Sequence, residues 1–535
     1  MAQITHLIER YINSLKDEKI LFFLTIGFVL IFYFMTLSLN STYDDNLSYL
    51  DIGKELAETG KYTGNFWNRA PTLPFIITVL YFLGTDIIII TVLIPLIFIV
   101  LFLIANHSMF RTLYNWRIAL FVDWAIIALP SFWRWSERVL VDTPFGAFAI
   151  FSLLFFYVGL EKDRRYLILS SLFFALTFLT KISGLVLIPI FLIYIIYRRK
   201  LNILVKKESI ISITLGLLLP ASVMWLIFTS DTSIFSIDTI YFAAVPQGKD
   251  YLIKFFLNPL FIFVPLGVYR AMKEWRKEHA IVLATITMFL LTFSTIATLM
   301  RYLIVLYGPI FFLSVYGLLM LNSRRFGKIL FSVIFVSGVI VGLVNTIYII
   351  DFVDSKTRFG VRDLAYFVEG SVNLNETIAA GNMAGYLSTY TSRNVIGFTY
   401  HVDVENRTIL VGDFNRIVTN PSHELYEKYV AFARNEKTKD YYYFEDNWVE
   451  ENNITYVVWS IYDDFLLNPK EEYYNIRYAG IEIPAKGAYH SIFPPPDYEL
   501  SSDLFQYLET SGNYKKIKEF HKEDYIIIVL YRFVG

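Results

Sequence analysis

Long apolar runs separated by short polar segments occupy the first two thirds of the chain. The first run, from Ile20 to Leu39, has no charged residue and is long enough to cross a bilayer as a helix. No small-residue cleavage site follows it, so we interpret it as a membrane anchor and not as a signal peptide. The pattern as a whole predicts a polytopic α-helical membrane protein with about eleven transmembrane helices. The later runs lie at roughly 87–105, 118–132, 139–160, 166–180, 182–197, 209–229, 251–269, 280–299, 302–321 and 329–350.

Charge between the runs predicts their orientation. If the N-terminus is cytoplasmic, the inside connections hold more than twice as many Lys and Arg residues as the outside ones. This excess is typical of cytoplasmic loops, so the sequence predicts a cytoplasmic N-terminus. The first external loop then spans residues 40–86, and its short apolar segment 73–83 is expected to lie in the membrane interface because it cannot span.

The pattern changes after residue 350. Short β-rich runs at Arg407–Gly412, Thr455–Ser460 and Tyr525–Phe533 alternate with helical stretches such as Ser422–Asn435. We therefore predict two domains, a transmembrane domain over residues 1–350 and a soluble extracytoplasmic α/β domain over residues 351–535.

Composition narrows the class of protein. Of the 535 residues 55% are hydrophobic and 18% aromatic, and the mean hydropathy is +0.48, which is too apolar for a soluble enzyme of this length. The net charge of −1 gives no nucleic-acid signal. The chain has no cysteine, and its seven histidines show no ligand spacing, so a divalent metal is possible but not indicated and no cofactor is predicted with certainty.

Polar residues gather at the outside ends of the apolar runs, where an ionisable group is costly unless it has a partner or faces a wet cavity. Carboxylates there can accept a proton from an acceptor hydroxyl, and cations can stabilise a departing phosphate. The candidate site residues are Asp44, Asp45, Tyr49 and Arg69 in the first external loop, Glu137, Arg138 and Asp142 near the fourth run, Lys181 after the fifth, and Arg301 and Tyr302 at the start of the tenth.

Each candidate also has a structural interpretation. Asp44 and Asp45 could mark the end of a span in water, and Asp142, before Thr143 and Pro144, could be a helix N-cap. Lys181 and Arg301 could extend to the interface from hairpins, and Asp123, inside the third run, could be paired within the bundle. These alternatives remain open from the residues alone.

Four motifs in the right order carry a family resemblance. They are Asp45-Asn46-Leu47-Ser48-Tyr49 with Arg69-Ala70-Pro71-Thr72-Leu73-Pro74, then Leu140-Val141-Asp142-Thr143-Pro144-Phe145, then Leu179-Thr180-Lys181-Ile182-Ser183-Gly184, and finally Arg301-Tyr302-Leu303. Together they resemble the superfamily of protein O-mannosyltransferases and lipid A aminoarabinose transferases, which has the glycosyltransferase C fold. The family usually follows its loop Asp with Glu, whereas here Asn46 follows Asp45, and an Asp44-Asp45 register would restore the acidic pair.

The resemblance implies a membrane enzyme that transfers a hexose or pentose from a polyprenyl-phosphate donor to a protein, lipid or glycan acceptor on the outer face, with inversion. Asp45, with Asp44 as alternate, would be the general base, and Asp142 would orient a sugar. Arg69, Arg138, Lys181 and Arg301 would hold the donor phosphate, with Tyr49, Glu137 and Tyr302 beside them.

Two other functions are compatible with the sequence. An oligosaccharyltransferase shares the fold, but its Trp-Trp-Asp-Tyr-Gly motif does not occur in this chain. A transporter or a receptor with an exterior ligand-binding domain would place Asp123 on a path through the bundle. Neither the donor sugar nor the acceptor follows from the motifs.

Overall fold

The structure, a computed structural model, divides the chain into two compact units, Met1–Asp351 and Phe352–Gly535. This division lies next to the boundary predicted after residue 350. The residues that the structure describes are 18–37, 44–64, 69–230, 259–295, 300–323, 325–349, 361–381, 384–397, 399–403, 408–412, 449–450, 452–460, 474–478, 481–485, 503–522 and 525–534.

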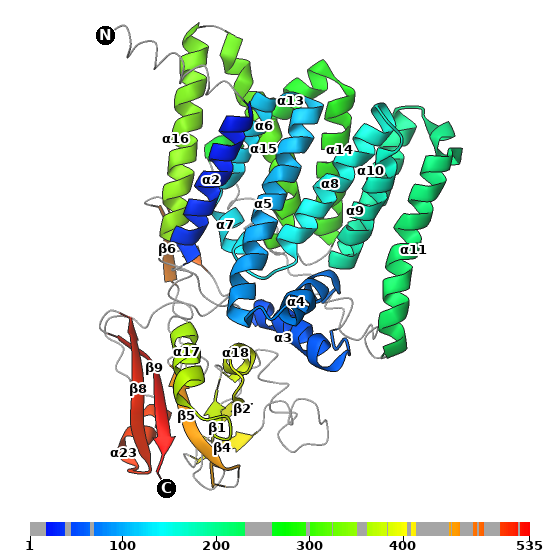
Figure 1. The fold of residues 1–535 in the computed structure, drawn as a ribbon. Coiled ribbons are helices and arrows are strands. Elements are labelled where there is room, and N and C mark those ends of the chain that lie inside the picture. The colour runs from blue at the N-terminus through cyan, green and yellow to red at the C-terminus, as the bar shows by residue number, and fades with distance from the viewer. Residues whose placement is uncertain are drawn as a thin grey trace, which may run out of the picture. The chain divides into compact units, whose positions relative to one another are not determined.

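The first unit is helical. Figure 1 shows its long helices running side by side, with α3 and α4 at one end of them. The helices are α2 (Glu18–Leu37), α3 (Asp44–Thr59), α4 (Thr72–Phe82), α5 (Ile87–Leu113), α6 (Trp116–Ile127), α7 (Pro130–Ser136), α8 (Asp142–Glu161), α9 (Tyr166–Thr180), α10 (Leu187–Tyr197), α11 (Lys207–Ser230), α13 (Val264–Glu274), α14 (Lys277–Thr295), α15 (Ile304–Leu318) and α16 (Arg325–Ile349). Short 3₁₀ segments are η1 (Ile182–Val186), η2 (Leu201–Val205), η5 (Pro259–Phe263), η6 (Met300–Leu303) and η7 (Leu319–Ser323).

Among the described residues, six helical segments are long and apolar enough to cross a membrane, or seven if α6 and α7 count as one broken span. They are α2, α5, α8, α11, the segment Arg301–Leu321 around α15, and α16. The helices α4, α9 and the η1–α10 segment are apolar but shorter. The prediction of several membrane-spanning helices is confirmed, and the count of about eleven stays a prediction.

Two predicted spans differ from the structure. The run at 118–132 is not one straight helix, because α6 ends at Ile127 and α7 follows at an angle of 72°. Pro130 explains the break: it begins α7 and restricts the preceding Leu129 to an extended backbone. In the run at 251–269 the described part begins at Pro259, and its α-helix, α13, ends at Glu274, beyond the predicted end.

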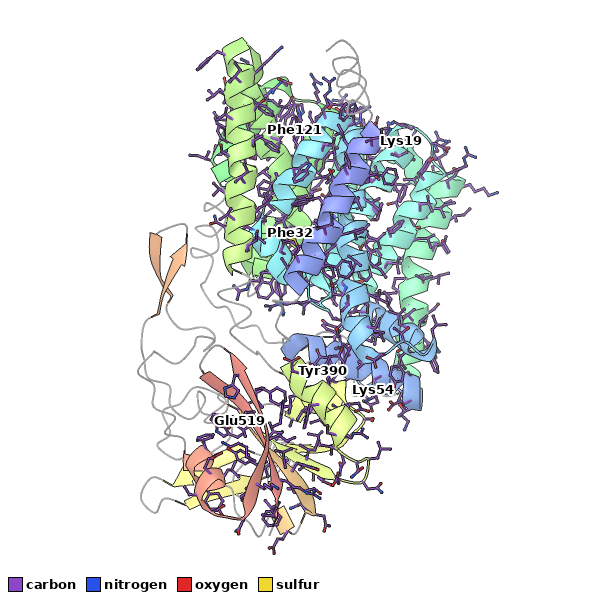
Figure 2. The ribbon with its side chains drawn as sticks, turned by 60° about the vertical axis from the view of Figure 1, so that its left-hand side comes forward. Lys19, Phe32, Lys54, Phe121, Tyr390 and Glu519 are labelled. Carbon is purple, nitrogen blue, oxygen red and sulfur yellow. The ribbon has the colours of Figure 1, made fainter. Side chains whose placement is uncertain are left out.

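Aromatic side chains pack the helices together. The ring centroids of Phe32 on α2 and Trp133 on α7 are 4.6 Å apart. Phe121 on α6 lies 5.1 Å from Phe331 and 4.8 Å from Phe335, both on α16. Figure 2 labels Phe32 and Phe121 within the helical unit. These contacts join α2 to α7 and α6 to α16, and α16 also contacts α7.

The second unit contains a five-stranded mixed sheet in the order β2-β1-β5-β9-β8, in which β1 is parallel to β2 and β5, and β9 is antiparallel to β5 and β8. The three predicted β runs correspond to β4, β5 and β9, so the predicted α/β fold class is confirmed. The helix predicted at 422–435 lies outside the described residues. The elements are β1 (Thr377–Ala380), β2 (Asn394–Gly397), β3 (Thr399–Asp403), β4 (Thr408–Gly412), β5 (Ile454–Ser460), β6 (Tyr474–Tyr478), β7 (Ile481–Ala485), β8 (Tyr514–Lys522), β9 (Tyr525–Phe533), α17 (Val361–Ser371), α18 (Ala384–Tyr390) and α23 (Asp503–Thr510).

Candidate active site

Two cations and one carboxylate meet at the start of α8. The Nζ of Lys181 donates a hydrogen bond to Asp142 Oδ1 at 2.7 Å, and the Nε of Arg301 lies 3.6 Å from Asp142 Oδ2. The exposed fractions of these side chains are only 2% for Asp142, 18% for Lys181 and 11% for Arg301. Three predicted site residues from three separate motifs therefore form one buried ion cluster.

Asp142 is the first residue of α8. The N-cap position belongs to Val141, and no side chain caps the helix, so the interpretation of Asp142 as an N-cap is wrong. A carboxylate in the first turn is still favoured by the helix dipole, and Pro144 is tolerated there because the first amides need no partner within the helix. The carboxylate is thus free of capping and can bind Lys181.

Lys181 lies at a break between two helical segments. Its backbone is extended, with φ −162° and ψ 130°, between α9 and η1. Its Nζ is 3.2 Å from the centroid of the Tyr302 ring and 5.9 Å from that of Phe145. The aromatic faces and Asp142 hold the ammonium inside the unit, so extension of Lys181 to the membrane interface is not what the structure shows.

Arg301 and Tyr302 belong to η6, which leads into α15. The Arg301 Cζ is 5.5 Å from the centroid of the Tyr302 ring. The cluster of Asp142, Lys181 and Arg301 carries two positive charges and one negative charge. Because charges interact strongly away from water, two neighbouring buried cations suit a bound anion such as a phosphate.

Tyr49 and Arg69 form a second group in the segment 40–86, which is predicted to be external. The Arg69 Cζ lies 5.2 Å from the centroid of the Tyr49 ring, and its Nη2 donates to Ser48 Oγ at 3.5 Å. The Tyr62 hydroxyl donates to the backbone carbonyl of Arg69, and burial, with a smaller contribution from Tyr49, raises the pKa of Tyr62 far above its usual value. Tyr62 therefore remains a proton donor and fixes the backbone at Arg69.

Glu137 and Arg138 follow α7. The Thr36 hydroxyl on α2 donates to Glu137 Oε1, and the Arg138 Cζ lies 5.1 Å from the Trp135 ring centroid. Both residues are buried. Because α7 also contacts η6, these residues join the same end of the helical unit as Arg301.

The chain is similar to known proteins in part of its sequence and in its fold. Residues 68–228 match the family described as dolichyl-phosphate-mannose-protein mannosyltransferase. The solved structure of ArnT from Cupriavidus metallidurans bound to undecaprenyl phosphate is similar, with a TM-score of 0.56, 13% identity, and coverage of 88% of this chain and 99% of ArnT. The oligosaccharyltransferase AglB from Archaeoglobus fulgidus, in complex with an inhibitory peptide and a dolichol-phosphate, gives a TM-score of 0.51 and 12% identity, covering 94% of this chain and 80% of AglB. No curated protein sequence matches the chain.

The chain has the glycosyltransferase C fold. The resemblance predicted from the sequence motifs is confirmed by the family match over residues 68–228 and by the similarity in fold. Several apolar helices together with this fold make the chain a multi-pass membrane protein. The family match includes Arg69, Arg138, Asp142 and Lys181.

The predicted general base lies at the start of α3 in this glycosyltransferase C fold. Asp44 and Asp45 are the first two residues of α3, and the positions of their side chains lie outside the described residues. α3 contacts α4, and α4 contacts α9, whose end precedes Lys181. The role of either Asp as a base therefore stays a prediction.

Several buried hydroxyl groups near the ion cluster were not predicted from the sequence. Tyr307 on α15 donates to Ser131 Oγ on α7 at 3.0 Å. The hydroxyls of Ser136 and Thr143 are buried and have no hydrogen-bond partner among the described residues. Thr143 follows Asp142 within the motif Leu140–Phe145, so the motif could have identified it as a site residue. Ser131, Ser136 and Tyr307 lie outside the four motifs, and no sequence pattern indicated them.

Asp123 is paired within the bundle. Its Oδ2 lies 2.7 Å from His107 Nδ1, and Asp123 is fully buried on α6. The structural interpretation of Asp123 is therefore confirmed. Across the residues that the structure describes, no three His, Asp or Glu side chains converge as a metal site.

Proposed function

We propose that this protein transfers a sugar from a polyprenyl-phosphate donor to an acceptor hydroxyl on the extracytoplasmic face of the membrane. The observation that carries the proposal is the buried cluster of Asp142, Lys181 and Arg301, in which two cations lie 2.7 and 3.6 Å from one carboxylate. The similarity in fold to proteins solved with undecaprenyl phosphate or dolichol-phosphate supports it.

The cations would act on the leaving group. Lys181 and Arg301 would bind the donor phosphate and stabilise the negative charge that grows on it as the bond to the sugar breaks. Asp142 keeps both cations in place before the donor arrives and would also orient a sugar. Arg69 and Arg138 would extend the phosphate-binding surface.

A carboxylate of the first external loop would act on the acceptor. Asp45, or Asp44 in the alternative register, would take the proton from the acceptor hydroxyl as its oxygen attacks the anomeric carbon. The electron pair of the broken bond would leave with the polyprenyl phosphate, and one displacement would invert the anomeric centre. The acceptor would be a protein, a lipid or a glycan.

Substitution of Arg301 tests the phosphate role. Arg301→Ala should lower kcat/KM about 10- to 100-fold, the equivalent of roughly 1.5–3 kcal/mol for a lost charged hydrogen bond. Arg301→Lys should lower kcat/KM less, because lysine keeps the positive charge and loses only the planar guanidinium group that can bind a phosphate through two hydrogen bonds. The measurement is initial rate in membranes that contain the full-length protein, with a panel of labelled polyprenyl-phosphate sugars.

The matched control is Arg165→Ala. The Arg165 side chain is 84% exposed and pairs with Asp163 in the connection between α8 and α9, so its loss should leave transfer unchanged. If Arg301→Ala behaves like Arg165→Ala in an active preparation, Arg301 has no role at the phosphate. If no sugar of the panel is transferred by the wild type, the proposed reaction itself is wrong for those donors.

A further inference from the structure

A second charged cluster lies at the other end of α8. The carboxylate of Glu161, the last residue of α8, is 2.8 Å from Arg198 Nε, 3.3 Å from Lys200 Nζ and 3.1 Å from Lys277 Nζ. Glu161 is 5% exposed, whereas the three cations are 30–36% exposed. Three cations from two further segments of the chain thus surround one buried carboxylate and remain partly exposed.

The backbone is shaped to bring Lys200 into this cluster. Arg199 has φ +52°, a left-handed conformation that residues other than glycine rarely adopt. The Lys200 amide then donates to Ile195 O at 3.1 Å, which ends α10. The turn lets Lys200 Nζ donate to Leu160 O at 2.8 Å beside Glu161.

The cluster has an excess of positive charge and one buried hydroxyl without a partner. The positive charges of Arg198, Lys200 and Lys277 exceed the negative charge of Glu161 by two. Glu278 accepts a hydrogen bond from the Tyr157 hydroxyl, and when its negative charge is included the net charge is +1. Tyr194 on α10 is 1% exposed, and its hydroxyl has no hydrogen-bond partner among the described residues. Glu161 and Arg198 lie within electrostatic reach of this hydroxyl.

The position of the Glu161 cluster along α8 indicates the layer of the membrane in which the cluster lies. Asp142 begins α8 and Glu161 ends it, and a helix of 20 residues is about 30 Å long at 1.5 Å per residue. That length equals the hydrocarbon thickness of a bilayer of about 30 Å. The cluster therefore lies at the headgroup layer opposite the candidate active site.

We propose that Arg198, Lys200 and Lys277, with the Tyr194 hydroxyl, bind the phosphate of an anionic phospholipid in that leaflet. Basic groups between helix ends are suited to lipid phosphates, because attraction to the headgroup adds to burial of the tails among apolar helices. Partial neutralisation by Glu161 keeps the site intact when it is empty. This site is separate from the proposed transfer reaction and does not depend on it.

Lipid binding to the full-length protein in a neutral detergent tests the proposal. Dioctanoyl-phosphatidylglycerol is titrated by isothermal calorimetry, with dioctanoyl-phosphatidylcholine and inorganic phosphate as separate arms. We expect binding of phosphatidylglycerol but not of phosphatidylcholine. Lys200→Gln should weaken it about tenfold by removing a charged contact, and Tyr194→Phe should weaken it about two- to fivefold by removing one hydroxyl.

The control is Arg165→Gln, which removes an exposed cation of the neighbouring connection and should leave affinity unchanged. Tyr194→Phe deletes only a hydroxyl that makes no hydrogen bond to described residues, so a folding defect would not account for its effect. Equal affinity for phosphatidylglycerol in wild type, Tyr194→Phe and Lys200→Gln would overturn the proposal. Displacement of the lipid by inorganic phosphate would assign the site to a soluble anion and overturn the lipid assignment.

Discussion

At the scale of single residues, Asp142 supplies the negative charge beside two buried cations. Lys181 and Arg301 are mostly buried, and two cations without a counter-charge would be costly there. The Asp142 carboxylate offsets part of their charge when no donor is bound. In the proposed reaction the same side chain would contribute both to stability and to function, so its replacement alone would not separate the two.

The proposed general base is a better target for substitution. Asp45→Asn keeps the size of the side chain but cannot accept a proton, so it should lower turnover by about 10²–10⁴-fold. Membrane insertion should change little, because the substitution lies in the first external loop and outside the apolar spans. The measurement is kcat with the donor that the wild type uses, corrected for the amount of protein in the membrane.

Asp44→Asn serves as the comparison for this prediction. If Asp45 is the base, Asp44→Asn should be milder, and if the acidic pair sets the register, the order should reverse. Near-normal turnover in both variants would remove the first external loop from the proton transfer.

At the scale of the helices, close backbone contacts decide how α13 and α15 cross. A Cβ on Gly267 of α13 would collide with the carbonyl oxygen of Leu313 on α15 and lie 2.6 Å from the carbonyl carbon. Gly317 on α15 is in turn placed against the backbone at Phe263 and Gly267. Small residues allow helices to approach in this way inside a membrane.

Gly267→Ala should therefore destabilise the helical unit by about 1–3 kcal/mol, the usual cost of overpacking. A lower midpoint of thermal unfolding in detergent would show it. The control is Gly27→Ala on α2, where a Cβ would meet nothing within 4 Å and alanine favours the helix by up to about 1 kcal/mol. Equal midpoints for the two variants would mean that the crossing of α13 and α15 tolerates a methyl group.

The helices also show what the sequence could and could not predict. Apolar runs located α2, α5, α8 and α16 because length and hydropathy suffice for that. The 72° break between α6 and α7 was missed, since a hydropathy pattern does not register the effect of one proline on its neighbour. Polar positions and motifs identified Asp142, Lys181 and Arg301, but their meeting depends on packing between α8, the α9–η1 break and η6, which no local pattern contains.

At the scale of the whole molecule, orientation in the membrane is the prediction with the widest consequences. The excess of Lys and Arg in alternate connections predicts that the connection after α3 is extracytoplasmic and the connection after α8 is cytoplasmic. Because the chain has no cysteine, single substitutions report only their own position. Lys61 and Arg164 are exposed in these two connections, and Ser371 is exposed in the second unit.

We expect an impermeant thiol reagent applied to intact cells to label Lys61→Cys and Ser371→Cys but not Arg164→Cys, which should react only after the membrane is opened. Labelling of Arg164→Cys alone would mean that the orientation is opposite to the predicted one. The cluster of Asp142, Lys181 and Arg301 would then lie on the cytoplasmic side. A donor delivered outside could not then reach it. Labelling of all three in sealed cells would contradict a span between Lys61 and Arg164, and with it the separation of the two charged clusters by the thickness of the bilayer.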